Sequence, residues 1–142
     1  MSENFAAKVQ ITISAPSAAV WEALTNPELI KKYFFGTHTE SDWKVGSPIT
    51  FSGEWEGKAY VDKGTILAIE EGRYIKYNYW SSMSGTEDIP ENYADISYEL
   101  MSQGNSTVLT ITQEGIASQE SKEHSEQNWA YVLDSMKQML ES

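Results

Sequence analysis

The sequence contains no cysteine, only two histidines, and about half as many basic residues as acidic ones. The absence of cysteine excludes disulfides, thiolate metal sites and cysteine nucleophiles. Ten Lys and Arg against 21 Asp and Glu give a formal net charge of −11, and no basic stripe interrupts that surplus. A surface of this sign repels phosphate backbones and anionic lipid headgroups, so neither nucleic acid nor a membrane is expected as a partner.

Long apolar runs are also lacking. No stretch approaches the roughly 18 residues that a membrane span needs, and the first ten residues lack the basic and apolar regions of a signal peptide. These features favour a cytoplasmic protein. With 142 residues and no linker or repeat, the chain is expected to form one domain over residues 1–142.

Hydrophobic periodicity predicts the secondary structure. Alternating apolar and polar residues predict strands over residues 5–13, 49–55, 58–70, 73–80, 94–100 and 107–113, with a further short strand within 38–48. Helical spacing, together with Pro16 and Pro27 in first turns, predicts two short helices over 17–25 and 27–34. Turns of hairpin length between the strands indicate an antiparallel sheet.

The final segment predicts a long helix that begins near residues 118–121 and runs almost to the C-terminus. Its apolar stripe is formed by Trp129, Val132, Leu133, Met136, Met139 and Leu140. Some 20 residues at about 1.5 Å each would span ~30 Å, the width of a small domain. The fold class is therefore α+β, with a curved antiparallel sheet of about six to seven strands wrapped on this helix.

Four stretches carry a family resemblance: VWEALTNPELIKKYF at 20–34, GTILAIEEGRYIKYNYW at 64–80, ISYELMSQGNSTVLTITQEG at 96–115 and HSEQNWAYVLDSMKQML at 124–140. Their order and spacing resemble the START-like (SRPBCC) superfamily with the helix-grip fold. Within it, the chain is most similar to the activator of heat-shock-protein-90 ATPase homologue family. The sequence departs from that pattern at Asn128, where the family often has glycine.

The resemblance implies a cavity between the sheet and the long helix, which in this superfamily commonly binds hydrophobic small molecules. The cavity candidates are aromatic and apolar residues on the inward strand faces, on the helix stripe and in the short helices: Trp21, Tyr33, Phe34, Phe35, Tyr77, Tyr79, Tyr98, Trp129, Leu133 and Met136. Phenols and indoles combine an apolar body with a polar tip, which suits a pocket. A solid aromatic core is the alternative reading of the same residues.

Other chemistry has weaker support. His38, Glu40 and Asp42 alternate and could hold zinc, but an exposed strand face accounts for them better. His124 shares a helix side with Glu120 and Asn128, where surface pairing is favoured over catalysis. No pattern predicts a metal, a cofactor or a catalytic residue.

The stretch SSMSGTEDIPEN, residues 81–92, is longer than the usual hairpin connection. Glu87, Asp88 and Glu91 could be read as acid catalysts, but their polar surroundings favour a solvated loop. A mobile rim beside the cavity, with Met83 and Ile89 folding over it, is the preferred interpretation, and simple slack is the alternative.

The leading hypothesis is non-enzymatic binding of a small hydrophobic molecule. A second is an enzyme of the same fold that uses acid–base chemistry, with Tyr77, Tyr79, Tyr98 and His124 as its groups. A third is a protein-interaction module with a chaperone partner. The chaperone-activating role belongs to longer proteins with an additional domain, so the resemblance does not carry it over.

Overall fold

The computed structural model describes residues 5–34, 36–55, 57–80, 87–89, 92–116 and 118–141. Three helices lie in these ranges: α1 (Ser17–Thr25), α2 (Pro27–Tyr33) and α3 (Gln119–Glu141). Seven strands accompany them: β1 (Phe5–Ile13), β2 (His38–Ser41), β3 (Pro48–Trp55), β4 (Lys58–Glu70), β5 (Tyr74–Tyr79), β6 (Ala94–Gln103) and β7 (Ser106–Ile116). The predicted order of elements is confirmed, and β6 and β7 each extend about three residues beyond the predicted ends.

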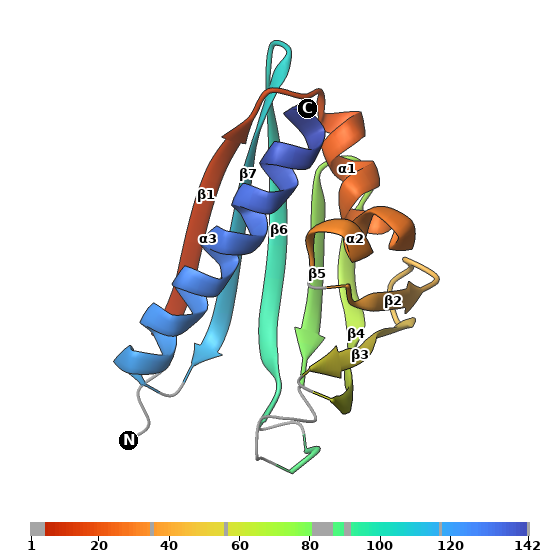
Figure 1. The fold of residues 1–142 in the computed structure, drawn as a ribbon, viewed down its shortest axis with the longest axis vertical. Coiled ribbons are helices and arrows are strands. Elements are labelled where there is room, and N and C mark those ends of the chain that lie inside the picture. Colours follow the sequence, from red (N-terminus) through yellow and green to blue (C-terminus); the bar gives the residue numbers. More distant parts are fainter. Residues whose placement is uncertain are drawn as a thin grey trace.

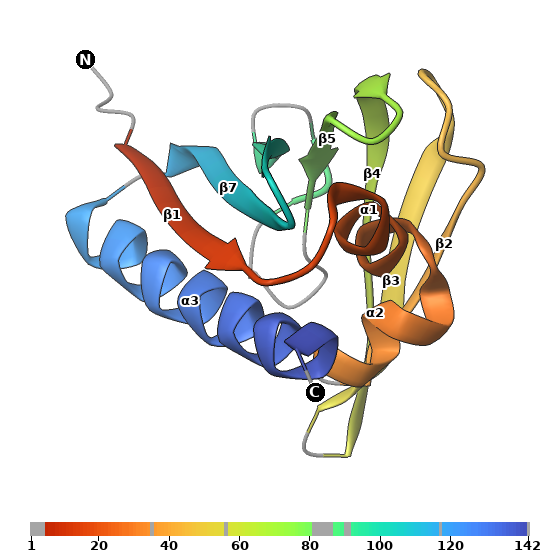
Figure 2. The same cartoon turned by 90° about the horizontal axis from the view of Figure 1, so that it is seen from above.

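The strands form one antiparallel sheet in the order β1-β7-β6-β5-β4-β3-β2. Among the described strands, β1 and β7 are the neighbours farthest apart in sequence, and β1 and β2 form the two edges of the open sheet. Figure 1 shows α3 lying across one face, and Figure 2 shows the sheet curving around that helix. The predicted α+β helix-grip architecture is therefore confirmed.

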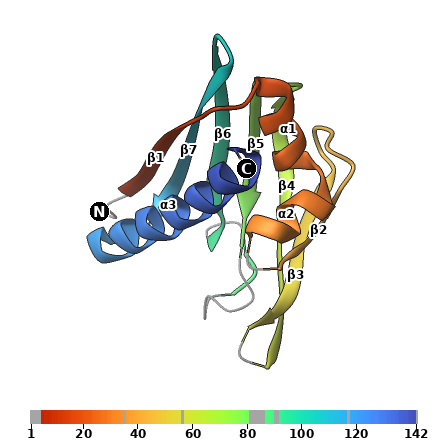
Figure 3. The same cartoon turned by 45° about the horizontal axis from the view of Figure 1, so that its top comes forward.

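The junction between the two short helices is built by Asn26 and Pro27. The Asn26 side chain accepts a hydrogen bond from the Glu28 amide at 3.0 Å and so caps α2, and Pro27 occupies the first turn, where its missing N–H costs nothing. The C-terminal half of α3 contacts this pair of helices, and both views show α1 and α2 beside the C-terminus (Figures 1 and 3).

Helix α3 buries four residues of the predicted stripe, Trp129, Val132, Leu133 and Met136, and its last two, Met139 and Leu140, are partly buried against the core. Its closest backbone contacts with the sheet are to β1 and β7. Its length serves this packing, and none of the described helices has the long apolar stretch needed to cross a bilayer.

Polar contacts along one edge fasten α3 to β1. The Glu126 carboxylate accepts from the Lys8 amide at 3.2 Å, and Glu141 accepts from the Ser14 amide at 2.8 Å. The Lys137 ammonium donates to the Thr12 carbonyl at 2.9 Å. Two acidic side chains of the helix thus accept hydrogen bonds from one backbone amide within β1 and one just after it.

Because of these contacts, the free energy of unfolding should fall as the pH becomes acidic. The Lys8 amide and the Lys122 ammonium lower the pKa of Glu126 in the folded chain. A lowered folded-state pKa adds stability above the unfolded value, near 4.5, which is lost as the pH falls through the folded one. Urea unfolding from pH 7 to pH 3 should therefore show a smaller loss of stability in Glu126→Gln than in the wild type. Glu123→Gln, exposed on the same helix, should lose stability with falling pH as the wild type does. An equal pH dependence of the unfolding free energy in all three proteins would contradict the role of Glu126.

The backbones of β4 and β5 approach so closely at position 64 that glycine is required there. A Cβ on Gly64 would lie 1.6 Å from the Asn78 carbonyl oxygen, although the backbone there is not in the left-handed region. The Asn78 side chain also accepts from the Thr65 amide at 2.7 Å. The obstacle is backbone rather than a flexible side chain, so the strands cannot yield without losing pairing.

Gly64→Ala should therefore destabilise the fold by about 1–3 kcal/mol or more, the usual cost of overpacking. The measurement is the free energy of unfolding in urea. Gly53→Ala is the matched control, because its added Cβ meets only the movable end of the Tyr60 side chain, 2.8 Å away. Equal losses of unfolding free energy in the two variants would show that a side chain at position 64 is tolerated between β4 and β5.

Candidate functional site

A hollow of about 550 Å³ lies between the N-terminal half of α3 and the concave face of the sheet. We call it the inner hollow. The described residues that line it come from both layers and from the segment after α2: Phe34, Thr37, Phe51, Tyr60, Asp62, Tyr77, Tyr79, Ile96, Gln113, His124, Ser125, Asn128, Trp129 and Val132. Its volume lies in the range of small-molecule sites.

Five aromatic rings form a closed circuit beside the inner hollow. Going round, the rings belong to Phe34, Phe51, Tyr77, Tyr98 and Trp129, with successive centroids 6.3, 5.9, 5.5, 6.1 and 6.0 Å apart. Such pairs stabilise a fold by about 0.5–1.5 kcal/mol each beyond their burial. The circuit joins the end of α2, three strands and α3, so it holds the walls of the hollow in place.

Polar groups lie on the sheet side of the inner hollow. The Tyr79 hydroxyl donates to Asp62 Oδ2 at 2.5 Å, and Asp62 is only 8% exposed. The hydroxyls of Thr37 and Tyr60 lie 2.7 Å apart and share a hydrogen bond. The wall is thus apolar in area but contains fixed hydrogen-bonding groups, as ligand sites usually do.

Helix α3 supplies the other polar groups. His124 and Asn128 are exposed and Ser125 is half-buried, and all three line the hollow. One turn deeper, the Trp129 indole N–H donates to Gln113 Oε1 at 2.9 Å. The first turns of α3 therefore form the solvent-facing side, and the predicted shared side of His124 and Asn128 is confirmed.

The buried phenols remain protonated near neutral pH. The hydroxyls of Tyr77 and Tyr98 lie 2.6 Å apart, and burial raises the pKa of Tyr98 to about 12. Burial, and then the neighbouring Tyr98, raises the pKa of Tyr77 well above its usual value. Burial does the same for Tyr33, whose hydroxyl donates to the Ala23 carbonyl at 2.8 Å. These groups can donate hydrogen bonds, but at neutral pH they are poorly suited to act as bases.

The sequence profile described as "Activator of Hsp90 ATPase homolog 1-like protein" matches residues 14–141, which span all three helices and six of the strands. The chain belongs to this family. Its START-like, helix-grip architecture agrees with that membership. A comparison with curated proteins gave no match.

Solved structures of family-like proteins superpose over nearly the full chain. The solution structure of ChR145 from Cytophaga hutchinsonii is 42% identical, covers 99% of this chain and 96% of its own, and has a TM-score of 0.86. Protein MLL2253 from Mesorhizobium loti is 20% identical, with 96% and 97% coverage and a TM-score of 0.80. The Aha1 dimer from Colwellia psychrerythraea is 19% identical, with 96% coverage of both chains and a TM-score of 0.75. The last two show the fold alone.

Four of the predicted cavity residues line the inner hollow: Phe34, Tyr77, Tyr79 and Trp129. The remaining described ones belong to the surrounding core, with Tyr33, Tyr98, Leu133 and Met136 buried and Trp21 partly buried against them. Phe35 lies outside the described residues. The structure thus combines the two sequence readings, since a solid core adjoins an open hollow.

Sequence reasoning missed the contribution of β3 and β4. Alternation in β4 puts Tyr60, Asp62, Gly64 and Ile66 on the concave face, so a carboxylate enters the interior. Phe51, its partner in the β3–β4 register, joins the same wall. The period-two pattern was available in the sequence, but which face is concave depends on the curl of the whole sheet.

The other candidate groups lie elsewhere. His38 Nε2 and Glu40 Oε1 are 3.0 Å apart, with side chains 57% and 71% exposed, as an outward strand face requires. Asp88 is ion-paired with Lys63 and accepts from the Tyr93 hydroxyl. Hydrogen bonds from Lys63 and then Tyr93 lower the pKa of Asp88, which suits an ionised anchor rather than a proton donor.

The structure describes only residues 87–89 and 92 of the 81–92 loop, for which the sequence favours a mobile rim beside the cavity. Met83 and Glu91 lie outside the described residues. Ile89 is 39% exposed and does not belong to the described lining of the inner hollow. Asp88 instead ties this end of the loop to Lys63 of β4, whose side chain alternates away from Asp62. The rim hypothesis therefore stays a prediction.

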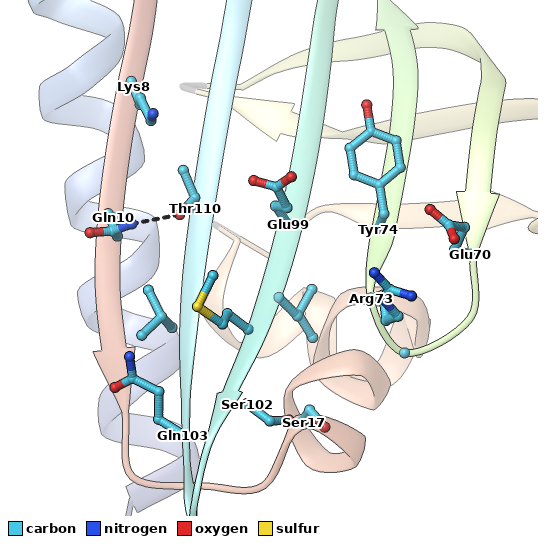
Figure 4. A pocket seen from close by; sticks show the side chains of 14 residues that line it. Lys8, Gln10, Ser17, Glu70, Arg73, Tyr74, Glu99, Ser102, Gln103 and Thr110 are labelled. Carbon is cyan, nitrogen blue, oxygen red and sulfur yellow. Dashed lines mark hydrogen bonds between the residues drawn. The ribbon is translucent and has the colours of Figure 1, made fainter.

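A second, larger depression of about 960 Å³ lies on the opposite face of the sheet (Figure 4). Charges of both signs line it, including Lys8, Arg73 and Glu99, and Gln10 donates to Thr110 at 2.9 Å. Met101 in its wall is 63% exposed. The inner hollow is the better candidate, because its wall contains buried aromatic side chains whereas the outer depression is mostly solvated surface.

The phenol pair beside the inner hollow predicts a coupling between two substitutions. Tyr98→Phe should cost about 1–3 kcal/mol, because it leaves the buried Tyr77 hydroxyl without this partner. Tyr77→Phe should cost a similar amount, whereas the double variant should cost less than the sum. Urea unfolding of the four proteins measures the coupling energy. Strict additivity would mean that the two hydroxyls do not depend on each other.

Proposed function

We propose that this chain binds a small, largely apolar molecule in the inner hollow and carries out no covalent chemistry on it. The observation that carries the proposal is the lining itself. Phe51, Tyr77, Ile96 and Trp129 present buried apolar surface to a space of about 550 Å³. A space of this size and wall chemistry suits an apolar ligand of one or a few rings.

Family membership supports the same function, because the resemblance to this family and its superfamily implies a ligand-binding cavity. The rigid aromatic circuit supports it further. Walls fixed by ring packing need little reordering when a ligand enters, so less of the binding free energy is lost to ordering.

The protonation state of the phenols favours binding over acid–base catalysis. A general base that works near neutral pH needs a pKa close to that pH. Burial raises the pKa values of Tyr77 and Tyr98 far above it. Tyr77 pairs with Tyr98, and Tyr79 donates to Asp62, so these hydroxyls hold the wall together.

Filling the hollow from the helix side should weaken binding. Ser125 is half-buried, lines the hollow and lies on α3, so Ser125→Trp would place an indole in the space. We expect the affinity for N-phenyl-1-naphthylamine, a neutral fluorescent probe, to fall at least about tenfold. Fluorescence titration measures the change.

Gln127→Trp is the matched control, since Gln127 is exposed on the same helix and is not among the residues that line the hollow. It should bind the probe as the wild type does. Circular dichroism and thermal unfolding establish that both variants are folded. No probe binding by the wild type, or equal affinities of folded Ser125→Trp and Gln127→Trp, would refute the inner hollow as the site.

A further inference from the structure

The inner hollow contains one feature that an apolar site does not require. Asp62 of β4 is 8% exposed, lies opposite Phe51 in the β3–β4 register and lines the space. An ionisable side chain is expensive to bury in apolar surroundings unless hydrogen bonds compensate. Its position among aromatic rings therefore calls for a reason.

The hydrogen bond from Tyr79 identifies Asp62 as an acceptor. The Tyr79 hydroxyl donates to Asp62 Oδ2 at 2.5 Å, so the carboxyl oxygen is oriented as an acceptor toward this wall. Holding Tyr79 does not by itself require a charge, because the amide oxygen of an asparagine could accept the same proton. A carboxylate has several acceptor positions, so it can receive a further donor from a ligand.

The remaining charges around the hollow are one-sided. Among the described residues that line it, Asp62 is the one carboxylate, and none is lysine or arginine. His124, exposed at the helix side, is the one lining group that could become cationic. The whole chain carries a formal charge of −11, which adds to the negative potential. An anionic head entering this space would lie near the Asp62 carboxyl group, and the described lining offers it no lysine or arginine.

We infer that the inner hollow selects apolar molecules whose polar head donates hydrogen bonds to Asp62, foremost a protonated amine and next a hydroxyl, and discriminates against carboxylic acids. This inference rests on the proposed function and adds the chemical class of the ligand. The aromatic wall takes the apolar body, and faces of Tyr and Trp rings near the site also attract a cationic head. Asp62 supplies specificity because a buried acceptor discriminates strongly between donors and anions.

The test uses four naphthalene compounds that share one apolar body and differ in a single substituent: aminomethyl, hydroxymethyl, methyl and carboxylate. Each is titrated at pH 7 into the ¹⁵N-labelled full chain, and the amide shifts give both the Kd and the site. The aminomethyl compound should bind at least about tenfold more tightly than the carboxylate, as a charge-assisted hydrogen bond implies. The hydroxymethyl compound should rank second, and shifts should cluster at Ile96, Trp129 and Val132.

Asp62→Asn isolates the charge, because the amide can still accept from Tyr79 and keep the wall in place. In this variant the preference for the amine over the carboxylate should shrink to within about threefold. Asp134→Asn is the matched control. It removes the same unit of net charge from an exposed position on α3 and should retain the full preference.

The outcomes separate the two proposals. If all four compounds bind in the hollow and the carboxylate binds as tightly as the amine, the head-group inference is wrong and the proposed function stands. An unchanged preference in folded Asp62→Asn also overturns the inference. If none of the four binds, or the shifts map to the outer face of the sheet, the proposed function fails and the inference fails with it.

Discussion

Everything at the candidate site depends on how one curved sheet is covered on its concave side. A single helix is too narrow to cover seven strands, so α3 packs on β1 and β7 and leaves the other strands to be covered differently. The α1–α2 pair lies on the same concave face, next to the C-terminal end of α3, and covers part of the remainder, with α2 contacting β2 (Figure 2). The aromatic circuit bridges the space between these two covers, and the inner hollow lies beside it.

Aromatic side chains suit this place for a physical reason. A large flat ring reaches across a gap that Leu or Val would leave empty, and its edge-to-face contacts have a preferred geometry. Tyrosine adds a hydroxyl that must find a partner when buried. The pairing of Tyr77 with Tyr98 satisfies two hydroxyls at once, while Tyr79 reaches Asp62. The same residues therefore stabilise the fold and set the polarity of the hollow.

The acidic character of the chain has different effects at different depths. On the surface, Glu126 and Glu141 satisfy backbone amides of β1 and the following turn and so hold α3 in place. At the exposed end of the long loop, Asp88 is paired with Lys63. Inside, Asp62 is buried in the wall of the inner hollow, where it accepts the hydrogen bond of the Tyr79 hydroxyl. Net charge alone does not distinguish these roles, since it says nothing about burial.

The sequence alone predicts the secondary structure, the antiparallel sheet and the long terminal helix, because periodicities of two and 3.6 residues reflect which side chains are buried. It also placed Tyr77, Tyr79 and Trp129 in one interior, since β5 and α3 each have a single apolar face. The three-dimensional fold was needed to show that Tyr98 lies behind the wall of the hollow, that Asp62 lies within it, and that Gly64 allows β4 and β5 to approach. Those outcomes depend on the curl of the sheet and on contacts between distant strands, which no local pattern encodes.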